Sequence, residues 1–160
     1  MAAAAYAFPV DALIQACKYA GHLAAGRALS ELLADAVSGE PAPDAIIPMP
    51  LHPARLRERG FNQALEIARP LAAATGVPLL THACARIKDT PPQVSLPRRE
   101  RKRNMRGAFS AVRRLDGMRI ALVDDVMTTG NTLGETARVL RKAGAAQVHA
   151  WTVARTLGQD

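Results

Sequence analysis

Two adjacent aspartates and a short hydroxyl-rich segment are the residues of this 160-residue chain best suited to chemistry. Asp124 and Asp125 are followed by two further residues and then by the segment 128–132, which is rich in threonine. Paired carboxylates accept hydrogen bonds from hydroxyl groups and repel a phosphate. Threonine hydroxyls and backbone N–H groups instead donate hydrogen bonds to phosphate oxygens. The spacing therefore predicts two neighbouring half-sites, one for a diol and one for a phosphate.

A strand and a helix are expected to position these residues. The apolar run at 120–123 is typical of a buried parallel strand, and a helical pattern begins at Leu133. The segment 128–132 then lies at a helix N-terminus, where unpaired N–H groups and the helix dipole favour an anion. Gly130 permits a close approach or a positive φ. A ribose 5-phosphate has the matching shape, and an acidic strand end capped by threonine, without a ligand, is the alternative.

The segment 120–132 resembles the phosphoribosyl diphosphate (PRPP) signature of the type I phosphoribosyltransferases. In that signature four apolar residues precede two acids, two further residues and T-T-G-x-T. The resemblance implies that the acid pair holds the ribose 2- and 3-hydroxyls as the catalytic pair, and that the loop amides hold the 5-phosphate. The ribose 5-phosphate site implied in this way consists of Asp124, Asp125, Thr128, Thr129, Gly130, Asn131 and Thr132.

Thr128 bears on the acceptor. In oxopurine-type members of the wider family, an acid near the purine N7 stands three residues after the second acid of the signature. This chain has Thr128 there, and a neutral hydroxyl cannot assist proton transfer in the same way. Efficient transfer to hypoxanthine or guanine is therefore not expected.

Two basic segments supply candidates for binding a diphosphate. The first, 51–63, follows a predicted strand end and carries arginines at three alternate positions. Arginine makes bidentate contacts with phosphate oxygens, although a solvated basic turn explains any single arginine equally well. The second, 98–106, carries six basic residues against one acid, and we interpret it as part of a mobile loop. The arginines expected to face a diphosphate are Arg55, Arg57, Arg59, Arg101 and Arg103.

Features outside the signature are similar to the ComF/GntX family of competence-associated phosphoribosyltransferase-like proteins. The runs at 48–53 and 59–63 carry part of the resemblance. Members of that family commonly begin with a four-cysteine zinc module, for which this sequence has no paired cysteines. Cys17 and Cys84 are far apart, so no structural zinc is expected. The other matching residues are Tyr19, Gly21, Gln93, Leu96, Arg101, Asn104, Gly107, Ala108 and Phe109.

The fold class expected from the resemblance is α/β: a doubly wound, mostly parallel five-stranded sheet flanked by helices, with an N-terminal helical pair. The alternation of predicted strands and helices from position 44 onwards agrees with it. We expect a single domain over 1–160. It would comprise the helical pair in 1–40, the core in 44–157 and the mobile basic loop in 88–107.

Several further expectations concern local structure. The first strand of the sheet is expected at 44–48, and a strand or strand pair at 77–87. Asn62 is expected to cap a helix that Pro70 kinks or breaks. Lys18, in the N-terminal helical pair, receives only a solvated or packed role.

Composition limits the partners without choosing among them. The formal net charge of +7 favours polyanions such as nucleotides, diphosphates or nucleic acid. Only 4% of the residues are aromatic, and the basic run has none among its charges, which weakens the case for direct single-strand binding. No apolar run approaches the roughly 20 residues of a membrane span, and a cytoplasmic location is expected.

Two functions from different classes follow. The first is an enzyme that displaces diphosphate from PRPP with a nitrogen nucleophile, aided by Mg²⁺ held mainly by the ligand, with no metal ligands supplied by the protein. The second is a non-catalytic module that acts in DNA uptake and competence through a protein or nucleic-acid partner. The sequence leaves homodimer formation open.

Overall fold

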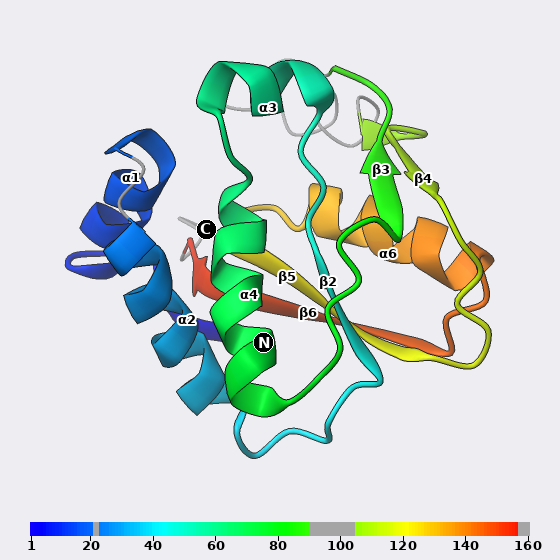
Figure 1. The fold of residues 1–160 in the computed structure, drawn as a ribbon, viewed down its shortest axis with the longest axis horizontal. Helices are drawn as coiled ribbons and strands as arrows, with labels where there is room; N and C mark the ends of the chain where they lie inside the picture. Colours follow the sequence, from blue (N-terminus) through cyan, green and yellow to red (C-terminus); the bar gives the residue numbers. More distant parts are fainter. Residues whose placement is uncertain (21–22, 90–104, 157–160) are drawn as a thin grey trace.

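The main sheet of the computed structural model, which describes residues 1–20, 23–89 and 105–156, is wholly parallel. Its strands lie in the order β1-β6-β5-β2 (Figure 1). The central strand β5 pairs with β2 on one side and β6 on the other. The bounds are β1 Ala2–Ala5, β2 Ala45–Pro48, β5 Arg119–Met127 and β6 Gln147–Arg155.

Alternation along β5 feeds two separate hydrophobic cores. Ala121 and Val123 belong to one core, and Ile120 and Leu122 belong to the other. All four side chains are fully buried, as expected for a central strand with helices on both faces of its sheet.

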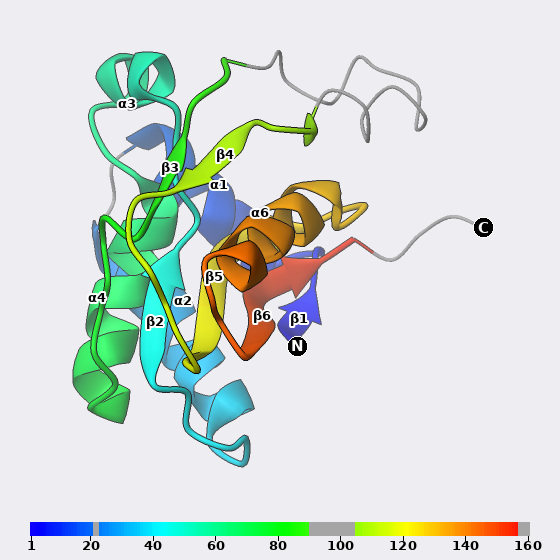
Figure 2. The same cartoon turned by 90° about the vertical axis from the view of Figure 1, so that its right-hand side faces the viewer.

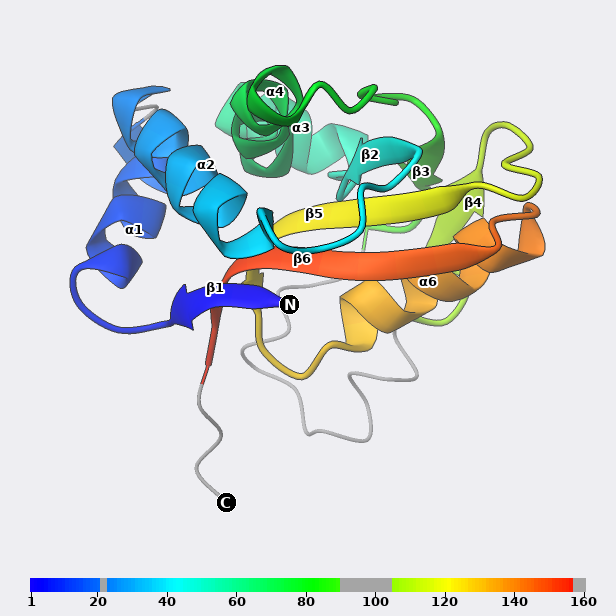
Figure 3. The same ribbon diagram turned by 90° about the horizontal axis from the view of Figure 1, so that it is seen from below.

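Helices cover both faces of the sheet, as Figure 3 shows. α1 (Val10–Ala20), α2 (Leu23–Val37) and α4 (Gln63–Thr75) lie on one face, and α6 (Asn131–Lys142) lies on the other. The predicted class, a doubly wound α/β fold with an N-terminal helical pair, is thus confirmed. None of the helices in the described ranges is long and apolar enough to cross a membrane.

A smaller unit lies beyond the main sheet. It contains the short helix α3 (Pro53–Arg59) and an antiparallel pair, β3 (Cys84–Arg86) with β4 (Phe109–Ala111) (Figure 2). Helix α3 follows the carboxyl end of β2 by four residues. In open parallel sheets, ligands bind beyond the carboxyl ends of the strands, so this unit stands on the side where a ligand is expected.

The strand count differs from the five expected. The described main sheet has four strands, and an isolated parallel bridge between Ile46 and Leu79 stands where the strand at 77–81 was expected. The strand at 44–48 is not the first, because β1 precedes it and pairs with β6. Four alanines have little intrinsic preference for a strand. The backbone hydrogen bonds to β6, rather than the local sequence, therefore stabilise β1 as a strand.

Helix α4 runs through Pro70 without the break that was one of the two expected outcomes. A proline inside a helix removes one backbone hydrogen bond and costs about 3 kcal/mol. Ile67, Ala68 and Leu71 on the same helix are fully buried in the core, and burial of that face offsets the cost. The expected cap is confirmed, since the Asn62 side chain accepts a hydrogen bond from the Ala64 N–H at 3.0 Å.

Candidate functional site

The acid pair lies near the carboxyl end of β5. Asp124 Oδ1 accepts a hydrogen bond from the Asp125 N–H at 3.0 Å, and Asp125 Oδ1 accepts one from the Val126 N–H at 2.7 Å. Asp125 is only 5% exposed, whereas Asp124 is half-buried. Asp124 is therefore the more accessible of the two carboxyls.

Lys18 reaches this pair from the N-terminal helix α1. Its Nζ lies 2.8 Å from Asp125 Oδ2. The sequence assigned Lys18 no functional role, because 107 positions separate it from Asp125 and only the resemblance at Tyr19 and Gly21 distinguishes its surroundings. Its position beside Tyr19 and close to Gly21, both of which match the ComF/GntX family, was the signal that could have identified it.

The electrostatics of the two acids differ. Burial, and then the neighbouring Asp125 carboxylate, raise the pKa of the Asp124 carboxyl well above its ordinary value, while Lys18 acts in the opposite direction. Burial and the neighbouring negative charge therefore favour the protonated form of Asp124. The pair can thus accept and donate hydrogen bonds with sugar hydroxyls.

Residues 128–130 connect β5 to α6, which begins at Asn131 and therefore includes the last two residues of segment 128–132. Thr128 and Thr129 are exposed, and Gly130 stands at the N-cap of α6 with φ +71°. The first N–H groups of a helix point out of its N-terminus. Because glycine has no side chain, Gly130 does not cap them with a side-chain hydrogen bond. The arrangement suits one phosphate group at the start of α6.

The first arginine segment forms the helix α3 rather than a loop. Successive residues in a helix are 100° apart, so Arg55 and Arg59 share one face and Arg57 lies on the other side. Arg57 is accordingly exposed. Arg55 pairs with Glu58 at 2.8 Å, and Arg59 Nη1 donates a hydrogen bond to Gln63 Oε1 at 2.5 Å. The three arginines do not converge on one point.

Arg86, at the end of β3, is a further cation near the site that the sequence did not single out. Its guanidinium lies 5.8 Å from the centre of the Phe109 ring. Burial lowers its pKa, and the charges of Asp89 and Asp124 raise it while Arg55 lowers it, so all three lie within its electrostatic reach. An arginine in an otherwise apolar strand was the signal that could have identified it.

The second basic segment falls mostly outside the described residues, including Arg101 and Arg103. The residues that flank it are anchored. Lys88 Nζ donates a hydrogen bond to the Arg106 carbonyl at 3.0 Å, and the Gly107 N–H donates one to Glu135 Oε1 on α6 at 2.8 Å.

Glu135→Gln is expected to lower the free energy of unfolding at neutral pH by about 1 kcal/mol, since a charged acceptor of hydrogen bonds is lost. Hydrogen bonds from Arg138 and Gly107 lower the pKa of Glu135 from 4.5 to about 2. The contribution is therefore fully present above pH 4.5 and lost as the pH falls towards 2. Urea unfolding across this pH range measures it. Glu31→Gln, which removes an exposed carboxylate 3.6 Å from Arg27, should have almost no effect at any pH.

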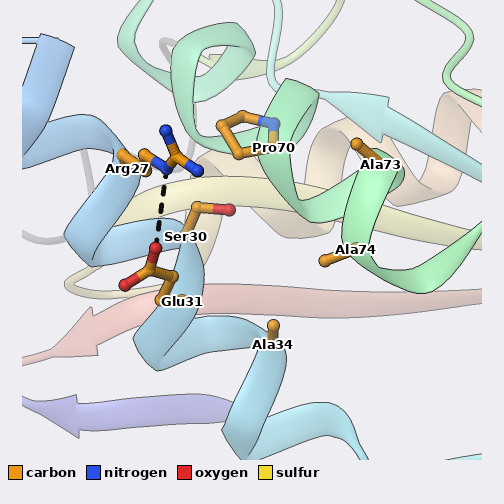
Figure 4. A pocket seen from close by; sticks show the side chains of 7 residues that line it. All are labelled: Arg27, Ser30, Glu31, Ala34, Pro70, Ala73 and Ala74. Carbon is orange, nitrogen blue, oxygen red and sulfur yellow. Dashed lines mark ion pairs between the residues drawn. The ribbon is translucent and has the colours of Figure 1, made fainter.

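A groove elsewhere on the surface does not include the acid pair or the 128–132 segment. It has a volume of about 460 Å³ and lies between α2 and α4 (Figure 4). It is lined by Arg27, Ser30, Glu31, Ala34, Pro70, Ala73 and Ala74.

Comparison with known proteins identifies the class of this fold. A family model described as the phosphoribosyl transferase domain matches residues 59–159. Among solved structures, the B. subtilis glutamine PRPP amidotransferase complexed with ADP and GMP resembles the chain with a TM-score of 0.53 and 24% identity. The match covers 78% of this chain and 25% of that one. The fold is that of the type I phosphoribosyltransferases.

More similar relatives narrow the class. The DNA utilization protein YhgH of Salmonella typhi is 36% identical over 158 residues, which are 95% of this chain and 70% of that protein. Competence protein F of Haemophilus influenzae is 36% identical over 159 residues, 94% of this chain and 69% of that protein. The chain belongs to the ComF branch of the phosphoribosyl transferase domain family.

Proposed function

We propose that this protein binds PRPP, or a ribose 5-phosphate nucleotide, and transfers the ribosyl group to a nitrogen nucleophile with release of diphosphate. One observation carries the proposal. A half-buried acid at the end of the central strand is followed, within six residues, by a glycine with φ +71° that opens a helix. That order supplies acceptors for a diol next to donors for a phosphate.

In this reaction the bond between the anomeric carbon and a diphosphate oxygen breaks, and a carbon–nitrogen bond forms as the nucleophile loses a proton. The transition state has oxocarbenium character, so the protein acts mainly by holding the ribose and stabilising the departing charge. Asp124 and Asp125 fix the hydroxyl side of the sugar, and segment 128–132 fixes its 5-phosphate.

A Mg²⁺ ion is proposed to accompany PRPP and to be bound mainly by the ligand. The described residues contain no group of three or more His, Cys, Asp or Glu side chains that could enclose a metal. Mg²⁺ retains several waters and is commonly held through substrate phosphates. When bound, the ion would neutralise part of the diphosphate charge.

Arginines on the smaller unit would hold the diphosphate. Arg55 and Arg59 share a face of α3, and Arg86 lies within electrostatic reach of both Arg55 and Asp124. Arg57 points away from that face and is proposed to remain in solvent. Arg101 and Arg103 remain candidates for the same role.

A second function is favoured by the names of the relatives, DNA utilization protein and competence protein. In it, the domain keeps the fold and the ligand site but does not turn over, and it acts in DNA uptake through a protein partner. The net charge of +7 also permits contact with nucleic acid.

Calorimetry with PRPP, ribose 5-phosphate and diphosphate, each with and without Mg²⁺, tests the first proposal. PRPP should bind more tightly than ribose 5-phosphate or diphosphate. Mg²⁺ should increase the affinity for PRPP and diphosphate far more than the affinity for ribose 5-phosphate. If none of the three binds, the ligand site is contradicted for both functions, whereas tight PRPP binding without release of diphosphate would favour the non-catalytic function.

The acceptor specificity gives a further prediction. Thr128 stands where an acid would assist proton transfer at a purine N7, and its hydroxyl does not ionise near neutral pH. Incubation with PRPP, Mg²⁺ and hypoxanthine or guanine should therefore form nucleotide only slowly. The rate should be at least about a hundredfold below that of an enzyme with a general base at this position, because such a base usually contributes that factor or more. Rapid formation of either nucleotide would contradict the role given to this position.

A further inference from the structure

The helix α1 holds Lys18 in a fixed position against the acid pair. Ile14 and Cys17, on the same helix, are 0% and 3% exposed and belong to the core that also contains Val123 of β5. A helix anchored by buried side chains one turn from Lys18 leaves its ammonium little freedom. Lys18 lies outside residues 59–159, so the matched family model does not include it.

The contact between Lys18 and Asp125 is a mostly buried ion pair. The two side chains are 20% and 7% exposed, and the Nζ to Oδ2 distance is 2.8 Å. The other oxygen of Asp125 accepts the Val126 N–H, whereas Oδ2 is buried, accepts no hydrogen bond from the described residues and has the Lys18 ammonium as its ion-pair partner. A buried ion pair seldom stabilises a fold more than apolar residues would, because both charges lose their hydration. A contribution to stability alone explains it poorly.

We propose that Lys18 is a positioning residue of the sugar-phosphate site, acting by holding the Asp125 side chain in place beside Asp124. This inference rests on the proposed function and extends it to a residue of the N-terminal helical pair. Lys18 itself need not touch the ligand.

Loss of Lys18 should weaken sugar-phosphate binding, because the buried Asp125 side chain is left without the partner that holds it beside Asp124. The acid pair then presents its acceptors to the sugar hydroxyls in a less fixed arrangement. Inorganic phosphate has no diol to bind there, so its affinity should change little.

The test compares ribose 5-phosphate with inorganic phosphate by calorimetry. Lys18→Met should lower the affinity for ribose 5-phosphate about tenfold or more and the affinity for inorganic phosphate by less than about threefold. Lys18→Arg, which keeps the charge, should recover most of the loss. Lys142→Met removes the same charge from an exposed position at the far end of α6 and should change neither ligand.

Asp125→Asn shows whether Lys18 acts through Asp125. In that background no buried carboxylate needs a partner, so adding Lys18→Met should change ribose 5-phosphate affinity by less than about twofold. This double variant also contains no unpaired buried charge, which protects the comparison if Lys18→Met alone folds poorly.

Three results would overturn the inference, and each is recognisable. Equal weakening of both ligands, with a lower melting temperature, would assign Lys18 to holding α1 in place. If Lys18→Met binds ribose 5-phosphate as tightly as the wild-type protein does, Lys18 has no part in the site, and the proposed function is unaffected. Failure of the wild-type protein to bind ribose 5-phosphate and PRPP would overturn the proposed function and this inference with it.

Discussion

The double variant Asp124→Ala, Asp125→Ala is expected to lose ribose 5-phosphate affinity by about a hundredfold or more, since each charged hydrogen bond contributes about 1.5–3 kcal/mol. Inorganic phosphate should still bind, because segment 128–132 and the start of α6 are unchanged. Calorimetry with the two ligands measures both effects. The ratio between them isolates the diol half of the site.

Two further variants complete that comparison. Asp124→Asn removes the more accessible carboxylate and leaves the Lys18–Asp125 pair intact, so it separates ligand binding from the burial of an unpaired lysine. Asp35→Asn, on the exposed side of α2, removes a carboxylate remote from the site. Unchanged ribose 5-phosphate affinity in the folded double variant would show that the diol lies elsewhere.

Gly130→Ala is expected to weaken inorganic phosphate and ribose 5-phosphate by about tenfold. The φ of +71° at Gly130 costs an L-residue about 1–2 kcal/mol, so the backbone would relax and move the N–H groups at the start of α6. Equilibrium binding of both ligands is the measurement. Unlike loss of the acid pair, this change should affect the two ligands alike.

Gly76→Ala is the matched control for that variant. Gly76 caps the C-terminus of α4 with φ +70°, and a Cβ there would meet nothing within 4 Å. The two substitutions should therefore destabilise the fold by a similar amount, about 1 kcal/mol. If Gly130→Ala and Gly76→Ala bind inorganic phosphate and ribose 5-phosphate with the same affinity, the loop at Gly130 does not bind the phosphate.

Local patterns predicted the part of the fold that local forces determine. The apolar run at 120–123 became the centre of β5, and α6 begins at Asn131, two residues before the Leu133 at which the helical pattern was expected to start. The cap at Asn62 follows from a side-chain contact only two residues long. In each of these cases the residues that specify the structure are neighbours in the chain.

Features that depend on distant contacts were missed. The alanines of β1 form a strand only because β6 offers an edge, and α4 passes Pro70 because its other face is buried. Arginines at alternate positions imply a shared side only in a strand, and here they form the helix α3, which separates Arg57 from Arg55. Lys18 meets Asp125 only once α1 packs on the core.

Isotope-labelled protein titrated with PRPP and Mg²⁺, followed by backbone amide NMR, tests the central claim most directly. Saturable shifts should appear at the amides of 128–132, at Asp124 and at Asp125, with Gly76 and the α2/α4 groove around Ser30 unaffected. Saturable shifts confined to that groove, or no saturable shifts at all, would contradict a ribose 5-phosphate site at the end of β5.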